Sequence, residues 1–127
     1  MRNRIFNVLL LLASLTPASV YALGLGELNL QSYLSQPLTA EIALVGVEPG
    51  DAELLEARLA SSKSHQKAGL ERPFSLSALK FVVQERAGGN PYIRVSTATP
   101  VKEPFFDFLL ELSAPDGRVF RQYTLLL

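Results

Sequence analysis

Short segments in which apolar and polar residues alternate one by one recur along most of this chain, and they restrict its fold more than any other feature. In the clearest segment, residues 38–44, the side chains of Leu38, Ile42 and Leu44 fall on one side. A period of two over this length predicts a half-buried β-strand. By similar patterns we predict further strands at residues 25–30, 52–60, 79–86, 91–97, 105–113 and 119–126.

The segment at residues 52–60 is open to a second interpretation. It is rich in Ala, Leu, Glu and Arg, which favour helix, and Asp51 could cap such a helix. We interpret it as a strand because its apolar and charged residues alternate. A short helix should follow, capped by Ser62 or Ser64 and ended by Gly69.

Turn residues between the segments indicate hairpins. Ala-Gly-Gly-Asn at residues 87–90 suits a connector with positive φ. Strands joined mainly by hairpins argue against a parallel α/β sheet. We therefore predict an all-β fold, an antiparallel immunoglobulin-like β-sandwich with one short helix, spanning residues 23–127. The chain contains no cysteine, so this sandwich has no disulfide.

The last hairpin carries the most specific local signal, Pro-Asp-Gly at residues 115–117. We predict a three-residue loop with Gly in a left-handed bulge, which pairs Ala114 with Arg118. In that register Phe120 lies opposite Leu112 on the apolar side of the sheet.

Residues 1–22 have the pattern of a secretory signal peptide. Arg2 and Arg4 precede an apolar run, and Val-Tyr-Ala at residues 20–22 suits signal peptidase. The run is too short to cross a bilayer, which takes about 20 residues. We predict export with cleavage after Ala22 and no membrane span in the mature chain.

The mature chain offers little for catalysis or nucleic-acid binding. Its ten basic and twelve acidic residues give a net charge of −2 without runs, whereas nucleic-acid binding needs a concentrated positive face. With no cysteine and a single histidine, we predict no catalytic, cofactor-binding or metal-binding residue. We expect His65 to lie on the surface. Asp51, Glu53 and Glu56 are interpreted as a solvated face rather than a glycosidase pair.

Two segments have a possible role in binding a protein partner. Residues 105–112 form the strongest apolar stretch of the mature chain, which is most simply a core strand. Alternatively, Phe105 and Leu109 present a contact patch on the more polar face of that strand. Tyr92 and Arg94 have the same two interpretations, because aromatic residues and arginine are enriched at interfaces. These four residues are the candidate partner contacts.

Five motifs are spread over nearly the whole length of the mature chain. They are Leu-Gly-Leu-Gly-Glu-Leu at 23–28, Ser-Gln-Pro-Leu-Thr-Ala-Glu-Ile at 35–42, Ala-Gly-Leu-Glu-Arg-Pro-Phe at 68–74, Pro-Val-Lys-Glu-Pro-Phe at 100–105 and Arg-Gln-Tyr-Thr at 121–124. In these motifs, taken in order, the sequence resembles the N-terminal periplasmic domain of FimV-type proteins. Such proteins are large inner-membrane proteins of Gram-negative bacteria that promote type IV pilus assembly, twitching motility and polar organisation.

The resemblance implies a periplasmic, non-enzymatic interaction domain whose partner is a protein of the pilus or envelope machinery. Family members also carry a LysM module and a transmembrane helix, which do not occur before Leu127. We therefore expect no peptidoglycan binding from this chain. An alternative from another class is a pilus-chaperone-like periplasmic holdase, although such a chaperone normally has two domains and a basic cleft. A secreted hydrolase would need a nucleophile and base that the sequence does not offer.

Overall fold

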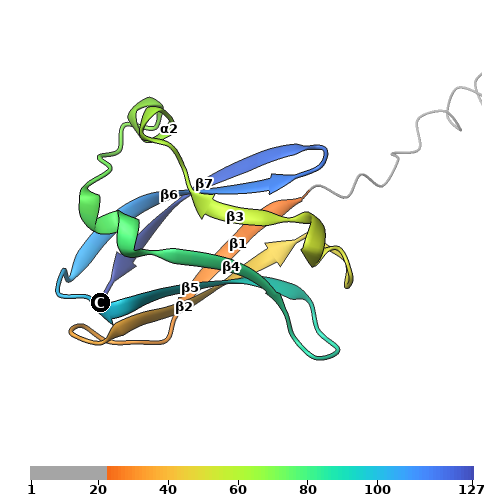
Figure 1. Ribbon diagram of the computed structural model, residues 1–127, viewed down its shortest axis with the longest axis horizontal. Coiled ribbons are helices and arrows are strands. Elements are labelled where there is room, and N and C mark those ends of the chain that lie inside the picture. Colours follow the sequence, from red (N-terminus) through yellow and green to blue (C-terminus); the bar gives the residue numbers. More distant parts are fainter. Residues whose placement is uncertain (1–22) are drawn as a thin grey trace, which may run out of the picture.

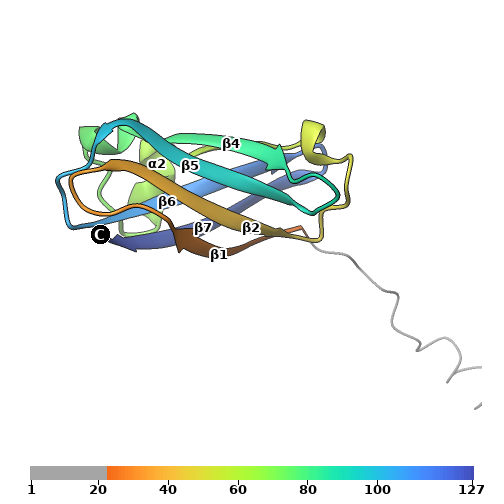
Figure 2. The same cartoon turned by 90° about the horizontal axis from the view of Figure 1, so that it is seen from below.

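The computed structural model describes residues 23–127, so the predicted signal peptide lies outside the described residues. Within this range the chain forms two antiparallel sheets packed face to face, as Figures 1 and 2 show from two directions. Sheet A has the strand order β1-β2-β5-β4, and sheet B has the order β3-β6-β7. The elements are β1 (Gly24–Leu30), β2 (Pro37–Val45), η1 (Ala52–Leu54), β3 (Glu56–Leu59), α2 (Ser62–Lys67), η2 (Phe74–Ala78), β4 (Lys80–Glu85), β5 (Pro91–Pro100), β6 (Phe105–Ala114) and β7 (Gly117–Leu126).

The predicted antiparallel β-sandwich with one short α-helix is confirmed for the described residues. Among them, no helix has the length and apolar character needed to cross a membrane.

The core lies between the two sheets and is built by the predicted alternation. Phe108 is fully buried, with its ring centroid 5.6 Å from that of Phe81 in sheet A and 5.7 Å from that of Tyr123 in sheet B. On β2 and β5 every second side chain points inward, because successive residues of a strand face opposite sides. The buried members of the core include Leu38, Ala40, Ile42, Leu44, Ile93, Val95, Phe106, Phe108, Leu110, Leu112 and Leu125.

One lateral edge of the sandwich is closed by side chains of β7. Arg121 Nη1 donates to the Leu25 carbonyl and Tyr123 Oη donates to the Gly26 carbonyl, each over 2.7 Å. Burial raises the pKa of the Tyr123 hydroxyl to about 12. These bonds join sheet B to β1 of sheet A.

Gly26 has a steric reason to be glycine. A Cβ at this position would lie only 2.8 Å from the carbonyl oxygen of Ala43 on β2. The pairing of β1 with β2 shifts register between Leu25 and Leu28, which brings the two backbones together here. Only glycine allows that close approach.

The segment at residues 52–60 combines both interpretations that the sequence left open. It begins with the 3₁₀ turn η1 and continues as the short strand β3, so the predicted strand starts four residues late. The helix that follows is confirmed, but its N-cap is Ser61, whose hydroxyl accepts from the Ser64 N–H. Gly69 lies just beyond the helix with a φ of 74°, as expected of a residue that ends one.

The predicted register of the last hairpin is wrong by one residue. Ala114 pairs with Gly117, so the loop holds only two residues and Gly117 opens β7. Leu112 therefore lies opposite Val119 instead of Phe120. A shift of one residue moves side chains to the other face. Phe120 consequently sits on the outer face of sheet B, where it is 44% exposed.

Candidate functional site

The predicted contact residues divide between the two outer faces of the sandwich. Tyr92 and Arg94 alternate with buried residues of β5 and lie on the outer face of sheet A. Phe105 and Leu109 alternate with buried residues of β6 and lie on the outer face of sheet B. The four residues therefore do not form one patch.

The two candidates on sheet B differ in accessibility. Phe105 is 54% exposed and pairs across the ladder with Leu126, which is 71% exposed. Leu109 is only 7% exposed, because α2 packs over this part of β6. Phe105 thus has much more exposed apolar surface than Leu109, of which only a small part is accessible.

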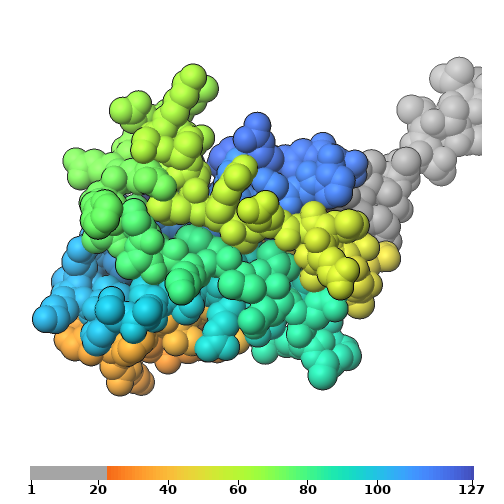
Figure 3. Space-filling view, in the orientation of Figure 1, coloured from red at the N-terminus to blue at the C-terminus, as the bar shows by residue number. Residues whose placement is uncertain are grey.

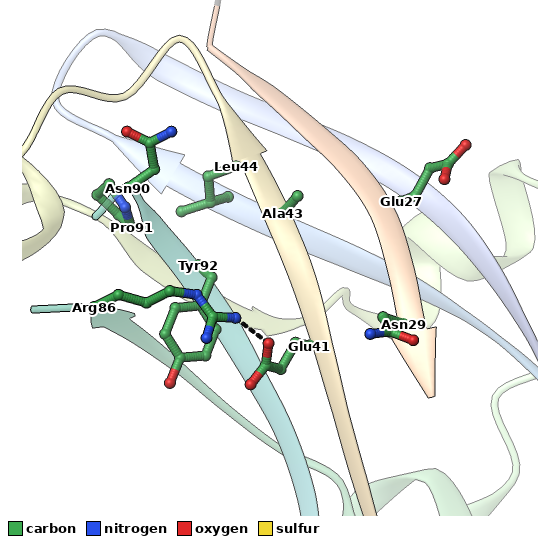
Figure 4. Close-up of a pocket in the computed structure, with 9 residues that line it drawn as sticks. All are labelled: Glu27, Asn29, Glu41, Ala43, Leu44, Arg86, Asn90, Pro91 and Tyr92. Atoms are coloured by element: carbon green, nitrogen blue, oxygen red, sulfur yellow. Dashed lines mark hydrogen bonds and ion pairs between the residues drawn. The ribbon is translucent and has the colours of Figure 1, made fainter. Parts of the chain in front are cut away.

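The outer face of sheet A carries a hollow of about 400 Å³ (Figure 4). Tyr92 is part of its lining, and Arg94, two residues further along β5, is exposed on the same face. The lining comes from β1, β2, β5 and the β4–β5 hairpin, and it consists of Glu27, Asn29, Glu41, Ala43, Leu44, Arg86, Asn90, Pro91 and Tyr92.

Within this hollow the Tyr92 ring is held in place from two sides. The Arg86 guanidinium lies over the ring, 4.3 Å from its centroid, and also pairs with the Glu41 carboxylate (Figure 4). The Tyr92 hydroxyl donates to Gln84 Oε1 over 2.8 Å. A cation–π contact at an exposed site contributes about 0.5–1 kcal/mol, so the arrangement orients the ring more than it stabilises the fold.

The hollow is lined mainly by residues with polar side chains. Its carboxylate, guanidinium, amide and phenol groups can donate and accept hydrogen bonds. Among residues 23–127, no group of three or more His, Asp or Glu side chains is placed to hold a metal ion.

A second polar arrangement, on the outer face of sheet B, escaped the sequence-based prediction. Glu111 is 5% exposed, and its carboxylate accepts hydrogen bonds from Arg58 on β3 and Arg118 on β7. Burial raises the pKa of this carboxyl, but the hydrogen bonds from Arg58 and Arg118 and their positive charges outweigh it, so the pKa lies below its usual value. The available signal was a carboxylate at an outward position of a mostly apolar strand.

His65 is not on the surface, contrary to expectation. It is fully buried between α2 and β6. Its Nε2 accepts from the Leu109 N–H over 3.1 Å, and its Nδ1 lies 3.0 Å from the Ser61 carbonyl, to which it donates. The surface expectation failed because the polar residues next to His65 in sequence lie on the other sides of the helix. Both ring nitrogens are used, so His65 anchors the helix to the sheet.

Two sheets with this antiparallel topology, packed around a core without cysteine, define an immunoglobulin-like β-sandwich domain. A protein-family model described as the FimV N-terminal domain, Ig-like domain, matches residues 23–127. The chain belongs to this family.

Two relatives extend the comparison. The proteins named motility hub protein FimV from Pseudomonas aeruginosa strains PAO1 and UCBPP-PA14 are each 43% identical to this chain over 114 residues. The match covers 89% of this chain but only 12% of each relative. No solved structure matches the chain.

Proposed function

We propose that residues 23–127 form a non-enzymatic interaction domain in the periplasm that serves type IV pilus assembly, twitching motility or the organisation of the cell envelope and pole. Membership in the FimV N-terminal family carries this proposal, since the matching relatives are named motility hub proteins. The partner is a protein of the pilus or envelope machinery. Phe105, Tyr92 and Arg94 are the candidate contacts with exposed or partly exposed surface.

The alternative of a pilus-chaperone-like holdase has less support. A chaperone that receives a client strand needs unpaired backbone groups along an edge strand. On β1, one of the four edge strands, the carbonyls of Leu25 and Gly26 already accept from side chains of β7.

The proposed location is tested by fractionating the source bacterium. N-terminal sequencing of the protein from the periplasmic fraction should begin at Leu23. An intact chain that stays in the inner membrane would contradict both the cleavage site and the location.

The proposed role is tested by deleting residues 23–127 in frame from the chromosomal gene. Twitching zones on agar and surface pilus protein should both fall, and a plasmid copy of the whole gene should restore them. Normal twitching and piliation in the deletion strain would refute the role.

A further inference from the structure

A hollow lies on the outer face of sheet B, between α2 and β7. It has a volume of about 410 Å³ and is lined by Ser64, Lys67, Ala68, Leu109 and Phe120. Leu109 forms an apolar floor, and the half-exposed Phe120 ring forms one wall. In Figure 3 the atoms of α2 rise beside those of the β6–β7 hairpin along the upper edge of the molecule.

The walls of this hollow are held rigidly. His65 of α2 accepts from the Leu109 N–H over 3.1 Å, and the Leu109 carbonyl accepts from the Ala60 N–H over 2.9 Å. The helix α2, Leu109 and the residue that follows β3 are therefore fixed relative to one another before a partner binds. A preformed surface lowers the entropic cost of association.

Three cations lie in or near the hollow, although the mature chain is net negative. Lys67 is part of the lining. Glu111 lies opposite Phe120 in the pairing of β6 with β7. The Glu111 carboxylate binds Arg58 and Arg118, which places both arginines near Phe120. The Glu111 carboxylate is buried and offsets one of these three positive charges, and Glu56 of the same copy lies near Arg58. The surface thus favours an apolar side chain accompanied by carboxylates.

The chain itself contains a segment with an exposed apolar side chain among carboxylates. Leu54 in η1 is 60% exposed, and the charged residues of 45–57 are all acidic and exposed: Glu48, Asp51, Glu53 and Glu56. None of these four carboxylates makes an ion pair within the part of the chain that the structure describes.

We propose that η1 of a second copy of this chain docks into the hollow between α2 and β7. Leu54 of the second copy contacts Leu109 and Phe120, while its carboxylates face Lys67, Arg58 and Arg118. The proposal rests on the proposed role as an interaction domain and names one of its partners. One small hollow and one turn make a limited contact area, so the association is weak, reversible and sensitive to salt.

Sedimentation equilibrium of the protein, purified as the source bacterium processes it, tests this contact. At low ionic strength and concentrations up to about 1 mM the mass should rise above that of the monomer, and added salt should reverse the rise. A monomer throughout would overturn the proposal. A monomer would not affect the proposed function, because the deletion strain tests that function separately through twitching and piliation.

Charge reversal identifies the surface. Lys67→Glu should weaken association about three- to tenfold, whereas Lys80→Glu, an equal charge change on an exposed residue of β4, should have little effect. Equal weakening by both variants would show a general charge effect and overturn the proposed site. A mixture of Lys67→Glu with Glu53→Lys should recover association that neither variant shows alone.

The apolar half of the contact is tested with neutral substitutions. Leu54→Ser and Phe120→Ser should each reduce association severalfold, while Val82→Ser, at a half-exposed position on sheet A, should not. Circular dichroism melts check that every variant stays folded. Unchanged association in both Leu54→Ser and Phe120→Ser would place the contact elsewhere and refute the proposal.

Discussion

Glu111 shows how a buried charge is accommodated on a mostly apolar strand. Its carboxylate is taken out of water by its neighbours on sheet B, which by itself disfavours the charged form. Arg58 and Arg118 reach it from the strands on either side, and each donates a hydrogen bond to a different carboxylate oxygen. Both arginine side chains stay more than half exposed, so only one of the three charges loses its hydration.

Glu111 should make stability depend on pH in the acid range. Its native pKa lies below the ordinary value of 4.5, so its contribution is fully present above that value and is lost as the pH falls through the native pKa. Glu111→Gln should lower the free energy of unfolding at pH 7 by roughly 1–3 kcal/mol. Urea titrations between pH 7 and 3 should show a smaller decline for Glu111→Gln than for the wild type. A parallel decline in the two proteins would contradict the role given to this carboxylate.

His65 determines how the single α-helix is attached to the sandwich. Six residues cannot form a stable helix on their own, so α2 depends on tertiary contacts. The imidazole supplies them by accepting from the backbone of β6 and donating within the first turn of the helix.

Replacing His65 with Ala should loosen this attachment. The variant loses a buried side chain and leaves the Leu109 N–H without its acceptor, at a cost of roughly 2–4 kcal/mol. Hydrogen exchange of the Leu109 amide should accelerate, and the melting temperature should fall. Lys63→Ala, at an exposed position of the same helix, serves as the control and should change neither. Unaltered exchange at Leu109 in the His65 variant would count against this anchor.

At the scale of elements, β1 depends on one glycine and two side chains of β7. The register shift at Gly26 turns its carbonyl toward the Tyr123 hydroxyl, while its missing Cβ leaves room for the Ala43 carbonyl. These contacts also cover part of an edge that would otherwise expose unpaired backbone groups.

Two glycines of β1 make a matched pair for testing this edge. Gly26→Ala would place a methyl group 2.8 Å from the Ala43 carbonyl oxygen and should destabilise the domain by about 1–3 kcal/mol. Gly24→Ala meets only Val45 at 3.6 Å, an ordinary contact, and should be nearly neutral. Thermal unfolding of both variants distinguishes them, and equal melting temperatures would contradict the close approach.

At the scale of the whole molecule, stability comes from one core shared by the two sheets. Phe108 of sheet B contacts Phe81 of sheet A as well as Phe106 and Tyr123 of its own sheet. A chain without cysteine has no disulfide to support such a core.

Phe108→Ala should therefore be among the most damaging single changes. Removing a fully buried ring costs about 3–5 kcal/mol, which is a large part of the stability of a domain of this size. Phe105→Ala, on the exposed side of the same strand, should cost far less. Denaturant midpoints measure both, and a Phe108 variant as stable as the Phe105 variant would refute this description of the core.

Local patterns were sufficient to predict most of the architecture. Strands such as β2 and β5 are predicted by alternation, since a period of two reflects which side of its own backbone a residue occupies. The hairpin at residues 87–90, the short helix and the sandwich class followed from the same local rules. The first half of the segment at 52–60 did not, because its composition suits a turn, a helix or a strand.

Only the tertiary structure decided which outward side chains stay exposed. Leu109 and His65 are buried because α2, more than forty residues before Leu109 in the chain, packs onto β6. A difference of one residue in the last turn moved Phe120 from the core to the surface. The sequence by itself determined most strands, and the inward faces of β2 and β5, because those depend on neighbours along the chain. The exposure of outward side chains depends on contacts between distant segments, which no local pattern records.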